Sequence, residues 1–318
     1  MIDEEAIRGF RERYNLLVVL GPTASGKTGI AIRLARRISG EIISADSRQV
    51  YTGMDLGTGK DLSAYGRDGP AVPCHLIDII PPTEEFSLFA YQERFYRCFQ
   101  EISGRGNVPI LTGGTGLYLD AVVRDYRLQA APENRSLREE LAKQEMPVLR
   151  RRFLALCPAI HNTTDLRERK RLIRAIEIAE FARDHPREAE PSVRIVPLVI
   201  GIRCRREDLR HKITARLESR LEAGMIEEVR QLHASGVPWE RLDSFGLEYR
   251  YIALYLQGKM AEKEMFQTLN TRIHQFAKRQ ETWFRRMERK GVRIHWVEGA
   301  DEGADEAAAL DLIAGRTA

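Results

Sequence analysis

The first feature that could carry chemistry is a glycine-rich run, GPTASGKT, at residues 21 to 28. It fits the phosphate-binding pattern G-x-x-x-x-G-K-[ST] and directly follows the apolar residues 16 to 20. In such a loop, successive backbone N–H groups and a helix N-terminus point at an anion. Lys27 would add a positive charge, and the Thr28 hydroxyl suits a magnesium ion. We therefore expect a di- or triphosphate ligand, Mg²⁺ as the cofactor and Thr28 as the metal ligand.

A polar cluster at residues 44 to 51 follows the next apolar stretch and contains Asp46. A carboxylate close to bound phosphate and metal has either a proton to take or a cation to hold. Aspartate is also common where a strand enters a loop, because its side chain caps turns. From the residues alone, a catalytic base and a turn residue are both open interpretations of Asp46.

A second glycine turn, residues 113 to 116, contains Thr115. Glycines there let the backbone approach a ligand closely. The Thr115 hydroxyl could bond a base or a phosphate, or it could cap the helix expected to begin near Leu117. Asp78 ends an apolar stretch and could hold Mg²⁺ through water. A turn at the end of a strand is the simpler explanation of Asp78.

These motifs need a scaffold that brings the ends of several strands together. Short apolar runs alternate with longer amphipathic ones, which is typical of a parallel sheet with crossover helices. Such sheets bind nucleotides at the carboxyl ends of their strands. We therefore predict an α/β fold, a P-loop NTPase-like parallel sheet core flanked by helices. The expected strands are residues 16–20, 41–45, 75–80, 108–112, 195–202 and 293–297, and the expected helical stretches include 29–38, 207–234, 239–257 and 262–290, with a peripheral helix after Glu298.

Residues 125 to 192 differ from the rest, with helical periodicity, no strand signal and five prolines. We predict a mostly helical insertion domain there, within a core domain formed by residues 1–124 and 193–318. Residues 150 to 174 carry eight basic residues against two acidic ones, and so do residues 270 to 296. Both runs could grip the phosphates of a nucleic acid, or each could be a solvated helix face.

The composition sets broad limits on the class of protein. The chain has 318 residues, 43% of them hydrophobic, and a net charge of only +4, so it should build a globular core of one or two domains. Its cysteines, Cys74, Cys98, Cys157 and Cys204, are widely spaced, which indicates neither a zinc site nor a disulfide framework, and we expect reduced, buried thiols. The acidic N-terminus and the lack of a long apolar run predict a cytoplasmic protein without a membrane partner.

Seven ordered blocks between residues 15 and 297 together resemble the tRNA dimethylallyltransferases, also called tRNA isopentenyltransferases. The blocks are GPTASGKT, SADSRQVYTGMDLGTGK, HLIDI, PILTGGTGLYL, RLIRAIEI, RLESRLEAGMIEEVRQL and FAKRQETWFRR. The resemblance implies that the chain transfers the prenyl group of dimethylallyl diphosphate to the exocyclic amine of the adenosine 3′ to the anticodon. The products are isopentenyladenosine and diphosphate, and the RNA partner is the anticodon stem-loop of tRNA. We expect a monomer, and no ATP phosphoryl transfer is implied.

The resemblance also implies residue roles. Asp46 matches the general base at the amine, and Thr23 and Arg220 match residues that bind the diphosphate and support its departure. The diphosphate would lie in the loop formed by Gly21, Pro22, Thr23, Ala24, Ser25, Gly26, Lys27 and Thr28, and the tRNA would contact Asp46, Ser47, Arg48, Gln49, Thr115, Arg138, Lys170, Arg171 and Arg174. To reach Asp46, the adenine must leave the anticodon-loop stack.

Two segments depart from the pattern of most family members. The chain has Gly-Thr-Gly-Lys-Asp at residues 57–61 in place of G-T-A-K-P, and Gly-Leu-Glu-Tyr-Arg at residues 246–250 in place of G-Y-K-E. The second departure falls in a tRNA-contact segment of the family, so it bears on RNA grip more than on the chemistry.

Two alternative functions belong to other classes. An adenylate isopentenyltransferase would prenylate free AMP, but it needs no basic insertion to hold RNA. A nucleic-acid-binding P-loop protein without transferase activity would leave no isopentenylated adenosine in tRNA. Mass spectrometry of nucleosides from tRNA treated with the protein and dimethylallyl diphosphate separates these alternatives from a tRNA prenyltransferase.

Overall fold

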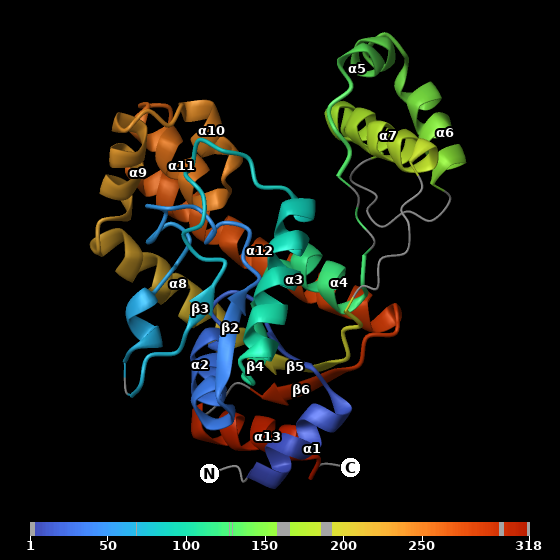
Figure 1. Ribbon diagram of the computed structural model, residues 1–318. Coiled ribbons are helices and arrows are strands. Elements are labelled where there is room, and N and C mark those ends of the chain that lie inside the picture. Colours follow the sequence, from blue (N-terminus) through green and yellow to red (C-terminus); the bar gives the residue numbers. More distant parts are fainter. Residues whose placement is uncertain are drawn as a thin grey trace. The chain divides into compact units, whose positions relative to one another are not determined.

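The structure is a computed structural model that describes residues 4–67, 69–126, 128, 130–157, 166–185, 193–298 and 302–316. The chain forms two compact units (Figure 1). The core unit comprises Met1–Tyr126 and Ile195–Ala318, and the insertion unit comprises Arg127–Arg194. The sequence-based limits of the insertion, 125 and 192, lie two residues from these boundaries.

The core unit contains a six-stranded, fully parallel sheet with the strand order β3-β2-β4-β1-β5-β6. The central strand β1 is buried along its whole length, as expected for a parallel sheet covered on both faces. This arrangement confirms the predicted P-loop-like α/β core. The strands are β1 (Leu16–Leu20), β2 (Gly40–Ser44), β3 (Cys74–His75), β4 (Val108–Gly113), β5 (Pro197–Arg203) and β6 (Ile294–Glu298).

Helices cover the two faces of this sheet. One hydrophobic cluster joins Leu17 and Val19 of β1 to helices α1 (Glu4–Arg13), α2 (Lys27–Ile38) and α13 (Glu302–Ala314). Helix α3 (Leu88–Gly104) packs against β2, β4 and α4 (Gly116–Val123). Residues Leu62–Tyr65 form a short 3₁₀ helix whose Tyr65 joins the α2 side of the core.

A second hydrophobic cluster is built from helices that follow β5. Phe245, Tyr249 and Ile252 are among its fully buried members. Figure 1 shows α9, α10 and α11 grouped beside the long α12. The helices are α8 (Arg206–Glu222), α9 (Met225–Ala234), α10 (Trp239–Ser244), α11 (Leu247–Leu256) and α12 (Glu262–Arg289).

Two predicted helical stretches are each divided by a glycine in a conformation that other residues avoid. Gly224, with φ +101°, separates α8 from α9, and Gly246, with φ +124°, separates α10 from α11. The expectation of continuous helices at 207–234 and 239–257 is therefore wrong at these two positions.

The predicted strand at residues 75–80 is also wrong beyond His75. Leu76 and Asp78 have positive φ angles of 61° and 53°, which interrupt an extended strand. The chain returns to the sheet direction only at Ile80, which forms an isolated parallel bridge with Tyr51. The apolar pattern of this segment reflects burial of single side chains and not a strand.

The C-terminal helix is part of the core, which corrects the expectation of a peripheral helix. Ala309 and Ile313 are fully buried in the cluster that includes α2. Glu306 forms ion pairs with Arg33 at 3.1 Å and Arg37 at 2.9 Å, both on α2. The acidic composition of this tail thus matches the basic outer face of α2.

The insertion unit contains the helices α5 (Arg135–Ala142), α6 (Met146–Leu156) and α7 (Arg169–Asp184). Their apolar faces meet around Leu149, Leu172 and Ile176, which gives the unit a small core of its own. Three of the prolines used to predict it, Pro158, Pro186 and Pro191, lie outside the described residues.

Two further sequence expectations concern the whole chain. All four cysteines are thiols outside any disulfide, but each is only half-buried, so the expectation that they are buried is wrong. Among the described helices, none combines the length and the apolar composition needed to cross a membrane.

Candidate active site

The phosphate loop connects the end of β1 at Leu20 to the start of α2 at Lys27. Gly26 adopts φ +84° at the N-cap of α2, and a Cβ on Gly21 would lie 2.6 Å from the Ser25 hydroxyl oxygen. Glycine is therefore needed at both ends of the loop. The turn places the N-terminus of α2 and the side chain of Lys27 at the carboxyl edge of the sheet, as an anion site requires.

A side chain that the sequence analysis did not single out joins this loop to the second glycine turn. The Gln280 Oε1 atom accepts a hydrogen bond from the Thr23 N–H at 2.8 Å, and its Nε2 atom donates to the Gly114 carbonyl at 2.8 Å. Gln280 is buried, and a Cβ on Gly114 would overlap its amide. The two loops, which are about ninety positions apart in the sequence, are thus held by one amide.

Asp46 lies where β2 enters the polar cluster. Its Oδ1 atom accepts hydrogen bonds from the backbone N–H groups of Arg48 at 2.8 Å and Gln49 at 3.4 Å, so the carboxylate does shape the turn. In the part of the chain that the structure describes, both hydrogen bonds of this carboxylate are made by Oδ1. The second oxygen is available for proton transfer, and the two interpretations of Asp46 are compatible.

Thr115 connects the second glycine turn to this cluster. It is the N-cap residue of α4, but its side chain makes no capping hydrogen bond. Its Oγ1 atom instead accepts from the Ser47 N–H at 3.0 Å. The capping interpretation is therefore wrong, and Thr115 holds the loop that carries Asp46.

These elements surround a cavity of about 560 Å³. Nine of the residues that line it were predicted as site residues from the sequence: Thr23, Lys27, Thr28, Asp46, Ser47, Arg48, Gln49, Thr115 and Arg220. One part of the wall is apolar and comes from Tyr65, Leu117, Phe245, Leu247, Ile273, Phe276 and Trp283. Gly21, Pro22, Ala24, Ser25 and Gly26 are not among the lining residues and form the body of the loop. The cavity therefore offers cations, a carboxylate and an apolar surface within one enclosure.

Two cations of the cavity, Arg279 and Arg216, were not predicted as site residues from the sequence, and Arg216 is the one that lies beside Arg220. It lines the cavity one helical turn before Arg220 on α8, so the i, i+4 spacing was the available signal. Arg216 donates to the Gly59 carbonyl at 3.0 Å. Arg220 donates to the carbonyls of Leu56 and Gly57 and pairs with Glu248 at 3.3 Å. Both guanidinium groups are thus held by backbone carbonyls at the edge of the cavity.

The protonation state of Lys27 depends on its burial and on the charged groups beside it. Burial, and after it the charge of nearby Arg216, lowers the pKa of Lys27 to about 8, while the charge of Asp46 opposes the decrease. Burial also lowers the pKa of Arg216, and Arg220 adds to that decrease. A bound anion would relieve the repulsion between these cations, so the cavity favours a negatively charged ligand.

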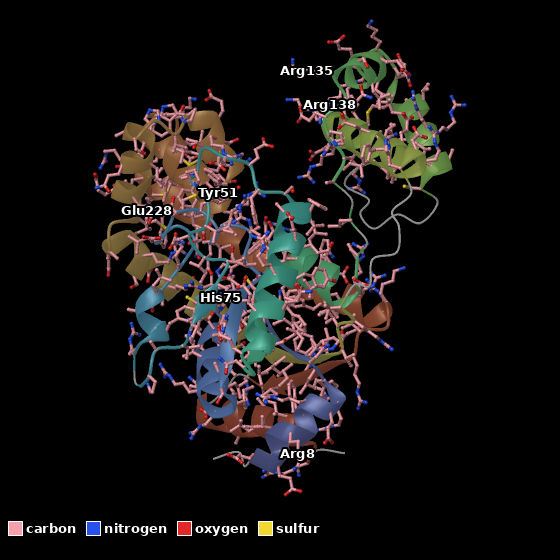
Figure 2. All side chains as sticks on the ribbon, in the orientation of Figure 1. Arg8, Tyr51, His75, Arg135, Arg138 and Glu228 are labelled. Carbon is pink, nitrogen blue, oxygen red and sulfur yellow. The ribbon has the colours of Figure 1, made fainter. Side chains whose placement is uncertain are left out.

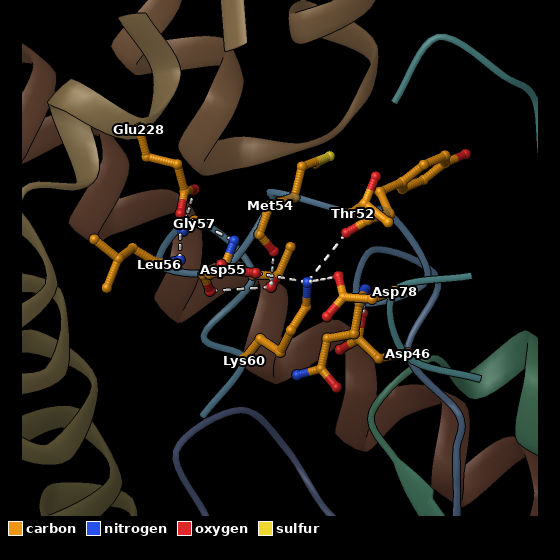
Figure 3. Close-up of polar contacts among 12 residues, drawn as sticks. Asp46, Thr52, Met54, Asp55, Leu56, Gly57, Lys60, Asp78 and Glu228 are labelled. Carbon is orange, nitrogen blue, oxygen red and sulfur yellow. Dashed lines mark hydrogen bonds and ion pairs between the residues drawn. The ribbon is translucent and has the colours of Figure 1, made fainter. Parts of the chain in front are cut away.

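Asp78 does not lie free for a metal ion. Its carboxylate forms an ion pair with Lys60, whose amine also binds Asp55 at 2.7 Å (Figure 3). No group of three or more His, Cys, Asp or Glu residues that could hold a metal ion occurs among the described residues. Thr28 lines the cavity beside Lys27, and one hydroxyl is a sufficient protein ligand for a Mg²⁺ ion held mainly by phosphate and water.

The predicted RNA-binding arginines of the insertion unit fall into two classes. Arg138, labelled in Figure 2, and Arg174 both bind the carboxylate of the buried Glu177, Arg138 at 2.8 Å. Lys170 and Arg171 are exposed, and among the described residues Arg171 forms an ion pair with Glu168 alone, at 3.2 Å. Arg138 and Arg174 therefore stabilise the unit, whereas Lys170 and Arg171 face solvent.

Comparison with known proteins places the chain in a family. The model of the IPP transferase family matches residues 49–287, and the model of the isopentenyl transferases matches residues 14–65. The chain belongs to the IPP transferase family. Among its curated relatives, tRNA dimethylallyltransferase 1 of Syntrophus aciditrophicus is 58% identical over 90% of this chain and 94% of its own length. The enzyme named tRNA dimethylallyltransferase 2 of Trichlorobacter lovleyi is 58% identical over 95% of this chain and 97% of its own length.

Solved members of the family have the same fold. The crystal structure of the full-length tRNA isopentenylpyrophosphate transferase of Bacillus halodurans matches with a TM-score of 0.70 and 32% identity, over 95% of this chain and 96% of the other. The crystal structure of a eukaryotic dimethylallyltransferase acting on tRNA matches with a TM-score of 0.76 over 95% of this chain and 80% of the other. Its sequence identity of 22% supports the likeness of fold alone.

The lowered pKa of Lys27 predicts a pH-dependent affinity for diphosphate. The amine is charged below about pH 8 and loses its proton above it, while a bound anion favours the charged form. The Kd for inorganic diphosphate should therefore rise by up to about tenfold per pH unit above pH 8. Isothermal titration between pH 7 and 10 measures this, with Lys27→Arg as the control, because its guanidinium stays charged and leaves only the ionisation of the ligand itself. A wild-type profile equal to that of Lys27→Arg would contradict the prediction.

Gly59 lies against Arg216, and this contact predicts a second effect. A Cβ at this position would overlap the guanidinium of Arg216. Gly59→Ala should displace Arg216 and raise the Kd for inorganic diphosphate by about tenfold, the effect of one charge-assisted hydrogen bond.

The matched control for this change is Gly53→Ala. Gly53 has a similar φ, +71° against +67°, but a Cβ there would meet nothing closer than 3.9 Å. Both variants therefore carry the same backbone strain, and only one moves Arg216. Equal affinities in the two variants would show that Arg216 does not bind the diphosphate.

Proposed function

We propose that this protein transfers the dimethylallyl group of dimethylallyl diphosphate to the exocyclic amine of the adenosine 3′ to the anticodon in tRNA. The observation that carries the proposal is the cavity itself, in which a phosphate loop, a carboxylate and an apolar wall meet. Membership of the IPP transferase family, with relatives named tRNA dimethylallyltransferase, supports the same reaction.

The donor binds with its diphosphate at the phosphate loop and its prenyl chain against the apolar wall. The backbone N–H groups at the start of α2, Lys27 and Arg216 face the diphosphate, and Arg220 lies next to Arg216. When the C1–O bond breaks, its electron pair leaves with the diphosphate, and these donors stabilise the charge that develops there. Phe245, Phe276 and Trp283 exclude water from the allylic carbon.

The acceptor amine approaches C1 from the side of Asp46. An exocyclic amine of adenine is a weak nucleophile, so removal of its proton during attack lowers the barrier. The new N–C1 bond forms as the C1–O bond breaks, and the proton passes to the Asp46 carboxylate. Thr115 and the turn formed by Ser47, Arg48 and Gln49 hold that carboxylate in place.

Thr28 would hold Mg²⁺ together with oxygens of the diphosphate. The ion would neutralise part of the leaving-group charge, as in other phosphate-loop sites.

The tRNA reaches this cavity as a folded RNA, and the exposed basic face of the insertion unit is the surface that we propose for its phosphates. Lys170 and Arg171 lie on that face, whereas Arg138 and Arg174 act by neutralising Glu177. An enzyme for free AMP would not need this unit. We further propose that the enzyme acts in the cytoplasm, where tRNA is decoded, and as a monomer.

Asp46→Asn provides the sharpest test of the base. Asparagine keeps an oxygen that can accept from the Arg48 and Gln49 N–H groups, but it cannot take a proton at neutral pH. The rate of prenyl transfer should fall on the order of 100- to 10,000-fold, with Asp46→Ala similarly inactive, while the affinity for tRNA stays close to that of the wild type. Single-turnover assays followed by mass spectrometry of nucleosides give the rate, and filter binding gives the affinity. An Asn variant within about threefold of the wild-type rate would remove Asp46 from the chemistry.

Arg171→Glu tests the insertion unit as the RNA grip. The change should weaken tRNA binding and lower the slope of log Kd against log salt by about 1, since one phosphate contact is lost. Any slow reaction on free AMP should not change.

The control is Arg183→Glu at the other end of the same helix. Arg183 is also exposed and also pairs with an acidic neighbour, Asp184 at 2.8 Å, so the charge change is matched. Arg174 is unsuitable for this test, because reversing its charge would leave the buried Glu177 carboxylate with one cation fewer and destabilise the unit. If Arg171→Glu binds tRNA with the wild-type affinity and salt slope, this face is only solvated.

A further inference from the structure

One carboxylate outside the cavity collects four hydrogen bonds. Glu228, on α9, accepts at Oε2 from the backbone N–H groups of Asp55 at 2.9 Å and Leu56 at 2.6 Å. At Oε1 it accepts from the Gly57 N–H at 2.9 Å and from the Tyr249 hydroxyl at 2.8 Å. Figure 3 shows the carboxylate against these consecutive residues of the loop. Three successive N–H groups on one carboxylate fix the direction of the loop backbone.

The carbonyls of the same loop point to the other side, toward the cations of the cavity. The carbonyls of Leu56 and Gly57 accept from the Arg220 guanidinium, and the Gly59 carbonyl accepts from Arg216 at 3.0 Å. In a peptide, the N–H of one residue and the carbonyl of the preceding residue share one rigid plane. The Gly57 N–H, which binds Glu228, therefore shares its plane with the Leu56 carbonyl, so a rotation of that peptide would move an acceptor of Arg220. The Gly57 and Gly59 carbonyls, which hold Arg220 and Arg216, follow within the next three residues of the same loop.

Packing restricts the conformation of the loop formed by residues 55–59. A Cβ on Gly57 would overlap the Tyr249 ring, so the backbone lies directly on that ring. Burial raises the pKa of Tyr249, and the Glu228 charge raises it further, so the hydroxyl stays protonated and donates. At the end of the loop, the amine of the buried Lys60 binds the Tyr51 carbonyl at 3.1 Å and the Asp55 carboxylate. The loop is thus fastened from two directions while Gly57, Thr58 and Gly59 line the cavity.

We propose that Glu228 is a positioning residue for the diphosphate site, acting through the loop of residues 55–59 on Arg216 and Arg220. Glu228 itself does not line the cavity. The inference rests on the proposed function in one respect, that the cavity binds the diphosphate of the prenyl donor. A carboxylate with a merely structural role would change how much protein is folded but not how tightly each folded molecule binds the donor.

The experiment compares Glu228→Gln with Glu227→Gln. Glutamine has the shape of glutamate, but its NH₂ group is a donor and must face N–H groups that Glu228 satisfies at present. Glu227 precedes it on α9, is exposed, and pairs with Arg230 and Gln231 on the same helix. The two variants change the net charge equally, and only one reaches the loop.

We expect Glu228→Gln to raise the KM for dimethylallyl diphosphate and the Kd for inorganic diphosphate by about tenfold or more. The KM for tRNA should stay within about twofold of the wild-type value, and Glu227→Gln should match the wild type throughout. The folded fraction of each variant comes from its thermal unfolding transition and from the amplitude of a single turnover. If Glu228→Gln lowers only that amplitude and leaves both diphosphate constants unchanged, Glu228 stabilises the fold and positions nothing.

Tyr249→Phe gives a second, milder change. It removes the hydroxyl that donates to Glu228 but keeps the ring beneath Gly57. Its effect on the KM for the donor should be smaller than that of Glu228→Gln, and the double variant should show less than the product of the two single effects, because both act through one carboxylate. Independent, multiplying effects would contradict the shared mechanism.

Failure of the proposed function has a different signature. If the wild type transfers no prenyl group to tRNA but its Kd for inorganic diphosphate still differs from that of Glu228→Gln, the transferase assignment is wrong and the positioning role stands. If the wild type is active and the two glutamine variants agree in their diphosphate constants, the positioning role is wrong and the transferase assignment stands.

Discussion

Five cationic side chains line one cavity in this protein, and the repulsion among three of them is the constraint that the surrounding structure must meet. Lys27 comes from the start of α2, and Arg216 and Arg220 come from successive turns of α8. Without a ligand, like charges at such a distance destabilise the folded state. The protein offsets this cost with fixed acceptors, namely the loop carbonyls and the Glu248 carboxylate. An anionic ligand would neutralise the positive charge that these acceptors leave uncompensated.

The same constraint accounts for the glycines of the site. At Gly59 the backbone lies against the Arg216 guanidinium, and a side chain there would overlap that group. Gly57 is needed beside it because its backbone lies on the Tyr249 ring. The two glycine turns at the edge of the sheet meet at Gln280 for a similar reason, because Gly114 leaves room for the amide. The phosphate loop and the second glycine turn are thus connected through the buried amide of Gln280, which bonds one backbone group of each.

Sequence patterns predicted the parts of this fold that depend on local periodicity. The phosphate loop, the parallel strands and the long α12 follow from apolar spacing and glycine placement, and nine cavity residues were identified from motifs. Patterns failed where a position depends on contacts distant in sequence. The run after His75 looks like a strand because its apolar residues are buried one by one, and the tail helix looks peripheral because the basic partners of its Glu306 lie on α2. Gln280 and Glu228 were missed for the same reason, since their partners are backbone atoms more than 150 residues away.

Charge counting alone also misjudged the basic insertion. The eight basic residues between positions 150 and 174 could have formed an RNA-binding surface or a solvated helix face, yet Arg174 of that run pairs with Glu177, as does Arg138 before it, and Arg152 pairs with Glu140 and Glu180. A buried carboxylate must be neutralised before a three-helix unit of this size can form a core. Part of the positive charge therefore stabilises the unit, and only residues such as Lys170 and Arg171 remain to attract phosphates. Because the two roles are carried by different side chains of one helix, RNA affinity can change through the exposed set without loss of the unit's stability.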